Sequence, residues 1–366
     1  MIRYSTYRCI LLLCILLISQ SLTACAAKPG MPVINQMSPS PASTIPAITT
    51  TIPQPTGNIG GIEGVTPPPT VNDKEDIITV TPRVDNDFET PVPTNPLILS
   101  EESLSARGCS ISLGESVDSF TLKLGSPNRI DTTEYDFDYY IYNNNYKRLL
   151  FVAVKEKKIV GFYTDSTDFD YNGIKSGSNL QIVNQSLKSS FTLKEVLTKK
   201  TDKYTVNILM DKIGTQSVTG IYVMPTQVKQ KEYSDTVIRN IELMVYDLTN
   251  SIRVRNKQAL LTWSSSAALS SRNHSKDMAQ NNFFSHINQI GRKPGDRMRE
   301  AGIYYSTCGE NIIAGYGTAI LSTHGWFNST NHREVMLQSK FRYLGVGFEY
   351  NEESSYKTFI TQNFYR

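Results

Sequence analysis

The chain has 366 residues, which is room for two ordinary domains, because a single hydrophobic core usually stops growing well before this length. Its 37 basic and 34 acidic residues give a formal net charge of +3 at pH 7. This near-neutral balance excludes the strongly basic surface that nucleic-acid binding requires.

The first 24 residues have the features of an export signal. Arg3 and Arg8 precede the apolar run Ile10–Ile18, which is too short to favour a membrane-spanning helix. The segment Leu22-Thr-Ala-Cys25 that follows resembles the cleavage site of bacterial lipoproteins, in which the cysteine becomes the lipidated N-terminus. The resemblance implies a signal peptide over residues 1–24 and a lipid anchor on Cys25 at the outer face of the membrane.

Residues 25–105 have the composition of a disordered linker. This segment is rich in Pro, Thr, Ser and Asn and contains 14 of the 17 prolines of the chain. Such a sequence cannot bury enough apolar surface to offset the entropy of ordering it. We expect it to hold the folded part of the protein away from the membrane, in or beyond a cell wall.

Residues 106–228 show the pattern of a mainly β module. Three apolar runs, Phe137–Tyr142, Leu149–Val154 and Lys158–Tyr163, are separated by short polar turns, which predicts strands joined by hairpins. The tyrosines of this region allow two interpretations, an aromatic surface that binds glycan or packing within the sheet, and packing is the commoner role. They are Tyr135, Tyr139, Tyr140, Tyr142 and Tyr146.

Residues 229–366 combine helices with a C-terminal pair of strands. Apolar residues recur at three- and four-residue spacing from Ile238 to Ile252, which predicts a long helix. Further helices are expected over about 265–281, after Pro294, and over about 318–329. The alternating segments 342–350 and 356–365 predict an antiparallel hairpin.

All four histidines lie between His274 and His332, among short motifs. These motifs are Asn282-Phe-Phe-Ser-His286, Cys308-Gly-Glu-Asn-Ile312, Trp326-Phe-Asn-Ser-Thr-Asn-His-Arg333, Tyr343-Leu-Gly-Val-Gly-Phe348 and Thr361-Gln-Asn-Phe364. Their order resembles the CAP superfamily, the SCP-like domain of cysteine-rich secretory proteins, antigen five and pathogenesis-related proteins. The resemblance implies an α+β fold in which the C-terminal domain is an α-β-α sandwich.

The preceding module is similar to the CAP-associated N-terminal domain found in many Firmicute proteins. The resemblance rests on Leu113-Gly-Glu-Ser116, Leu124-Gly-Ser-Pro127 and the strand at Ile159-Val-Gly161. The chain is therefore expected to have four parts: a signal peptide (1–24), a linker (25–105), a CAP-associated domain (106–228) and a CAP domain (229–366).

Two imidazoles and a carboxylate are a usual ligand set for zinc or a similar divalent ion. Members of the CAP superfamily line a cleft with two histidines and two glutamates, and His286, Glu310 and His332 match three of these positions by motif. Ser329 stands where the second glutamate is expected, which implies weaker metal binding and leaves Glu310 as the one candidate for a catalytic base. The alternative is that the three side chains bond to one another and have only a structural role.

The other two histidines and the cysteines have less specific interpretations. His274 is expected to be a partly buried packing residue and His324 to lie near the surface of its helix. Cys109 and Cys308 fall in different predicted domains, which favours two unpaired thiols.

Three functions are compatible with these features. The first is a surface-anchored binding protein whose cleft holds a small apolar ligand, a peptide or a divalent metal, and whose N-terminal module contacts the cell wall or a partner. The second is a metal-dependent hydrolase of wall peptide or protein, with Glu310 as base. The third is a structural envelope protein without a ligand. The missing second glutamate favours binding over catalysis.

Overall fold

A computed structural model describes residues 102–366, all of which belong to one compact unit, Phe88–Arg366. The predicted signal peptide, the lipidation site Cys25 and nearly all of the linker lie outside the described residues. One boundary needs correction, because strand β1 (Ser103–Ala106) begins before the predicted end of the linker at residue 105. Leu104 in this strand is fully buried, so the folded region starts by residue 103.

The N-terminal domain is built mainly from two sheets. Its elements are β1, β2 (Cys109–Ser112), α1 (Val117–Leu124), β3 (Arg129–Thr132), β4 (Asp138–Tyr142), η1 (Tyr146–Arg148), β5 (Leu150–Lys155), β6 (Lys158–Thr164), β7 (Asp170–Tyr171), β8 (Ile174–Lys175), α2 (Leu180–Ser186), β9 (Val196–Lys200), β10 (Tyr204–Met210) and β11 (Val218–Pro225). A seven-stranded antiparallel sheet has the order β3-β4-β5-β6-β11-β10-β9, and a four-stranded sheet has the order β2-β1-β7-β8. The predicted mainly β module is thus confirmed.

The seven-stranded sheet is covered on both faces, which explains the continuous apolar run at residues 149–154. Phe151 and Ala153 contribute to a core shared with the C-terminal domain, whereas Leu150 and Val152 face the small sheet and helices α1 and α2. The same burial shows the role of one of the tyrosines. Tyr139 is 4% exposed, so it packs within the sheet and offers no aromatic surface for glycan.

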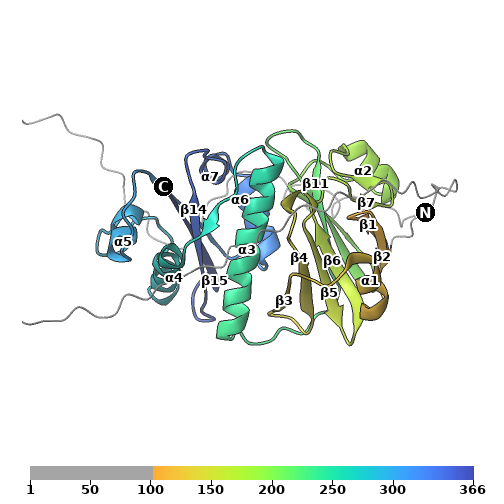
Figure 1. Cartoon of the computed structure of the whole chain (residues 1–366), viewed down its shortest axis with the longest axis horizontal. Helices are drawn as coiled ribbons and strands as arrows, with labels where there is room; N and C mark the ends of the chain where they lie inside the picture. The colour runs from red at the N-terminus through yellow and green to blue at the C-terminus, as the bar shows by residue number, and fades with distance from the viewer. Residues whose placement is uncertain (1–101) are drawn as a thin grey trace, which may run out of the picture. The chain divides into compact units, whose positions relative to one another are not determined.

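The C-terminal domain is a sandwich with a sheet between two layers of helices. Its elements are α3 (Asp235–Arg255), β12 (Thr262–Trp263), α4 (Ser265–Gln280), α5 (Pro294–Glu300), β13 (Cys308–Ala314), α6 (Ala319–Phe327), α7 (Thr330–Met336), β14 (Tyr343–Tyr350) and β15 (Thr358–Tyr365). The sheet has the order β12-β14-β15-β13. Helix α4 lies on one side of β14 and β15 and α3 on the other (Figure 1). The predicted α+β class and the α-β-α sandwich are confirmed.

Strand β14 shows how the sequence sets these layers. Leu344 and Val346 point into the core beneath α3. Gly345 and Gly347 point the other way, and a Cβ atom on either would lie 2.0–2.1 Å from backbone nitrogens of α4. Alternation of glycine with large apolar residues therefore lets α4 approach the sheet closely on one face while the other face fills the core.

The two domains share one hydrophobic core and a polar interface. Asp247 of α3 accepts hydrogen bonds from Arg129, Asn143 and Tyr146 of the N-terminal domain, at 2.8–2.9 Å. Arg255 pairs with Asp165 at 2.8 Å. Because these buried charges are paired across the boundary, we expect the two domains to unfold together.

Two further properties concern the cysteines and the length of the helices. Cys109 and Cys308 are free thiols, as predicted. Within residues 102–366, none of the helices is both long and apolar enough to cross a membrane.

Candidate functional site

Glu310 is the centre of a buried polar cluster. It lies on β13 with its side chain 1% exposed, and its two oxygens have different partners. Oε1 bonds with Nδ1 of His286 at 2.9 Å, and Oε2 accepts from the Arg297 guanidinium at 2.6 Å. The His286 side chain is 49% exposed, so the cluster joins a buried ion pair to a solvent-accessible imidazole.

Arg297 ties this cluster to the loop that contains His286. Pro294 begins α5, and Asp296 accepts a hydrogen bond from the backbone of Lys293, which fixes the start of the helix. Arg297 follows in the last turn of this short helix, and its Nη1 donates to the carbonyls of His286 and Arg292 at 2.9 Å each. The same guanidinium therefore holds both the carboxylate and the backbone that bears the imidazole.

His332 approaches from the opposite layer. Strand β13 is at the edge of its sheet, so residues from the two helical layers can meet beside it. Ser329 is the N-cap residue of α7, and its hydroxyl bonds with Nδ1 of His332 at 2.8 Å. Asn311 of β13 donates to the His332 carbonyl at 3.2 Å and so positions the turn that bears the imidazole.

The electrostatics agree with this proximity. Burial lowers the pKa of His332 below its ordinary value, and the neighbouring His286 imidazole lowers it further. His332 is therefore neutral at pH 7, and a neutral imidazole has a nitrogen lone pair available for a ligand. Across the part of the chain from residue 102 onward, the Nε2 atoms of His286 and His332 have no hydrogen-bond partner.

The three predicted ligands are thus near one another, but they do not form a three-ligand metal set. Among residues 102–366 no group of three or more His, Cys, Asp or Glu side chains has an arrangement that could hold a metal ion. The reason is visible at Glu310, because both of its oxygens already face donors of the protein. Glu310 contacts the Nδ1 side of the His286 ring. A carboxylate in this position orients the imidazole.

The other two histidines are more buried than the sequence suggests. His274 is fully buried, bonds through Nε2 with the Ser285 carbonyl at 2.9 Å, and lies 3.9 Å from Glu310. His324, expected near the surface, is 6% exposed. Its Nε2 bonds with the Glu195 carbonyl of the N-terminal domain at 2.9 Å, so the prediction is wrong because the second domain covers this face of α6.

Sequence reasoning missed Arg297. Three arginines lie at positions 292, 297 and 299, and no local pattern distinguishes the buried one. The available signal was indirect, since a buried Glu310 needs a counter-charge and α5 is the basic element nearest to its motif in the sequence.

Comparisons with known protein families match both domains. Residues 246–364 match the model of the cysteine-rich secretory protein family, and residues 113–225 match the CAP-associated N-terminal model. The uncharacterized membrane protein YlbC of Bacillus subtilis (strain 168) is 29% identical over 315 residues, which is 74% of this chain and 89% of that protein. YkwD of the same organism is 36% identical over 107 residues, 29% of this chain and 42% of that protein.

Two solved structures share the fold. One is an extracellular protein containing an SCP domain from Bacillus anthracis, with a TM-score of 0.59, 24% identity, and coverage of 77% of this chain and 99% of its own. The other is a cysteine-rich secretory protein from Staphylococcus aureus, with a TM-score of 0.52, 15% identity, and coverage of 69% and 93%. At these identities the likeness concerns the fold.

Proposed function

This chain contains a CAP domain of the cysteine-rich secretory protein family, preceded by a CAP-associated N-terminal domain, and from that premise we propose a function in ligand binding. The protein is an envelope protein, and the imidazoles of His286 and His332 form its ligand-binding site. Its relatives include one named as a membrane protein and one described as extracellular, which supports a place at the cell surface.

One observation is the main support for the binding site. The Nδ1 atoms of His286 and His332 are both tied to the protein, by Glu310 and Ser329 respectively. Tying one ring nitrogen fixes the ring orientation and directs the other nitrogen outward. We take these two Nε2 atoms, each on an oriented ring, as the groups that bind the ligand.

A divalent metal such as zinc is the ligand class that best matches this pair. His286 and His332 would be its protein ligands, and Glu310 would orient His286 from behind. Two imidazoles are fewer ligands than structural zinc sites have, so the ion would be held weakly and exchange with solvent. When bound, such an ion would supply Lewis acidity in the cleft.

A hydrolase with Glu310 as base receives less support. A general base needs a carboxylate oxygen open to the water that it activates. Here Arg297 donates to one oxygen at 2.6 Å and His286 bonds with the other at 2.9 Å. The same arrangement suits a rigid binding site, because it holds the imidazole in one orientation.

A small apolar ligand or a peptide remains the second candidate, because a cavity opens beside Arg297. The cavity has a volume of about 300 Å³ and lies between α4 and α5. Its walls include Leu269 and Ile290, which are 49% and 80% exposed. A ligand with an apolar body would match these walls.

The proposal includes a lipid anchor on Cys25, which is supported by the segment Leu22-Thr-Ala-Cys25. A doubly acylated cysteine holds a protein on a bilayer far more firmly than a single chain. Cell fractionation of the Cys25→Ala variant tests this part. The variant should appear in the medium, and its retention in the membrane fraction would argue against a lipid anchor.

Metal analysis tests the binding site. Purified full-length protein, incubated with zinc and then desalted, should retain bound zinc at pH 7 and lose it as the pH falls through the range in which the imidazoles protonate. Retention that does not change with pH would argue against imidazole ligands. Complete loss at pH 7 would leave the apolar-ligand candidate in its place.

A further inference from the structure

The edge of the N-terminal sheet at β9 differs from the opposite edge. At the opposite edge, β3 is covered by α3, where Asn240 donates to the carbonyl of Thr132 at 3.0 Å. Strand β9 pairs with β10 on one side. Within residues 102–366, no strand pairs with its other side, so the sheet has one covered and one open edge.

The register of the β9–β10 pairing shows which backbone groups this edge presents. The backbone bonds from Thr201 to Tyr204 and from Met210 to Glu195, both 2.8 Å, place the carbonyl of Glu195 and the N–H of Thr201 on the β10 side. In an antiparallel ladder such residues alternate with residues whose backbone groups face outward. The N–H and C=O groups of Val196, Thr198 and Lys200 therefore point away from β10.

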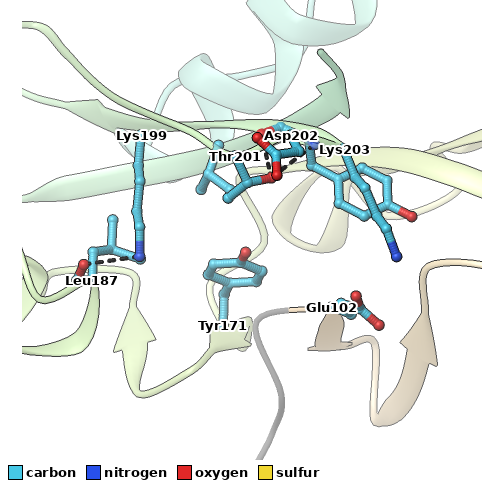
Figure 2. A pocket seen from close by; sticks show the side chains of 9 residues that line it. Glu102, Tyr171, Leu187, Lys199, Thr201, Asp202 and Lys203 are labelled. Carbon is cyan, nitrogen blue, oxygen red and sulfur yellow. Dashed lines mark hydrogen bonds between the residues drawn. The ribbon is translucent and has the colours of Figure 1, made fainter. Parts of the chain in front are cut away.

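Two hollows lie next to this edge. The first has a volume of about 300 Å³, and its lining includes Leu187 and Val206 together with charged residues. Figure 2 shows Lys199, Thr201, Asp202 and Lys203 along one side of it, with Tyr171 and Glu102 opposite. The second has a volume of about 360 Å³ and includes Phe191 and residues 196–198 of β9 in its lining. An added strand would have a pocket for side chains near each end of β9.

We propose that an extended, acidic peptide segment of another protein binds to the β9 edge as an additional strand. In this mode backbone hydrogen bonds supply affinity and the pockets beside the strand supply sequence preference. The five residues of β9 span about 17 Å, enough for a peptide of similar length. The β9 edge belongs to the N-terminal domain, and its role as a binding surface does not depend on ligand binding by His286 and His332.

The charge of the β9 edge indicates which kind of partner binds it. Residues 188–203 contain five lysines, at positions 188, 194, 199, 200 and 203, and two acidic residues, Glu195 and Asp202. Lysines on an edge strand disfavour pairing with a like edge, because equal charges would lie opposite each other. A second copy of this chain is therefore a poor partner, whereas a peptide with glutamates at alternate positions is complementary.

Fluorescence anisotropy with the full chain tests the proposal. The probe is a labelled heptapeptide of alternating Glu and Val, and the comparison peptides are an alternating Lys and Val sequence and the acidic peptide N-methylated at alternate residues. We expect the acidic peptide to bind at least about tenfold more tightly than either, because N-methylation removes backbone donors and lysine reverses the charge.

Variants of the edge locate the binding. Thr198→Pro removes an outward N–H without affecting the ladder to β10, and should abolish binding of the acidic peptide. Thr198→Val is the matched control, since it loses the same hydroxyl but keeps the N–H, and should bind normally. Lys200→Glu should weaken binding, whereas Lys340→Glu, an equal charge change at an exposed site outside the sheet, should not.

Three results would overturn the proposal. They are equal binding of the N-methylated peptide, undiminished binding by a folded Thr198→Pro variant, and concentration-dependent self-association of the chain that Thr198→Pro abolishes. Such self-association would mean that the β9 edge binds a second copy of this chain. Should Thr198→Pro fail to fold, the comparison of the three peptides on the parent protein still decides.

Discussion

Two regions of the molecule combine histidines with buried carboxylates, and they differ in how completely the protein bonds these groups. At the interface between the domains, Nε2 of His324 bonds with the Glu195 carbonyl at 2.9 Å. Beside β13, His286 and His332 use Nδ1 for protein contacts, and within the described chain their Nε2 atoms have no partner. The Nε2 atom of His324 is therefore bonded within the protein, whereas those of His286 and His332 are available to a ligand.

The buried carboxylates of the two regions differ in the same way. Asp247 at the interface accepts from three side chains of the other domain, which makes it a connection between domains. Glu310 of β13 bonds with Arg297 and with an imidazole that is 49% exposed. A fully bonded buried group contributes to stability and specificity. A buried group that orients a side chain with an unbonded atom is instead suited to a ligand-binding site. The comparison therefore predicts different consequences for equivalent mutations.

The largest expected effect is at the interface. Asp247→Ala removes the acceptor for Arg129, Asn143 and Tyr146, and leaves a partly buried arginine with a single carboxylate partner, Asp131. We expect the free energy of unfolding to fall by about 3–5 kcal/mol, measured by urea denaturation. The exposed Glu353→Ala is the control, expected within about 0.5 kcal/mol of the parent. A loss below about 1 kcal/mol at Asp247 would mean that the domains are coupled mainly by their apolar core.

The second effect depends on pH. Burial lowers the pKa of His324 to about 4 in the folded protein. Between pH 6.5 and about 4 the unfolded chain binds a proton at this site that the folded protein does not, so stability falls as the pH falls. The loss across this window is roughly 3 kcal/mol, and it is absent above pH 6.5. His324→Gln should flatten the pH dependence of urea denaturation, and an unchanged slope would mean that His324 is not closed off by the interface.

The third effect separates stability from binding. Glu310→Gln keeps the shape of the side chain but removes the charge that pairs with Arg297, so we expect a loss of about 2 kcal/mol in the free energy of unfolding. It also weakens the orientation of His286, which should reduce zinc affinity roughly 10- to 100-fold. Asp247→Ala should leave zinc affinity unchanged. Equal effects of both variants on zinc binding would remove the distinction between the two regions.

Much of the fold could be predicted because it depends on local patterns. The spacing of Ile238, Ile241 and Val245 predicted α3, and the alternation in residues 343–348 predicted β14. The order of the motifs around His286, Glu310 and His332 indicated the family. The packing of Tyr139 and the free thiols also followed from composition and spacing.

The remaining features depend on contacts between distant segments. His324 bonds with a residue 129 positions earlier, so its burial could not be read from its own helix. Arg297 could not be distinguished from Arg299 until the fold brought it to Glu310. The start of β1 was missed because the strand has four residues and gains its stability from pairing with β2 and β7.

Calorimetric titration with zinc at pH 7 tests the central claim, that the imidazoles of His286 and His332 form a ligand site. His286→Ala and His332→Ala should each abolish the binding that the parent protein shows. His324→Gln should bind as the parent does, because that imidazole is closed off at the interface. His274→Asn should also retain most of the affinity, because Nε2 of His274 is occupied by the Ser285 carbonyl. Absence of binding to the parent, or equal losses at all four histidines, would contradict the claim and leave His286 and His332 with a structural role.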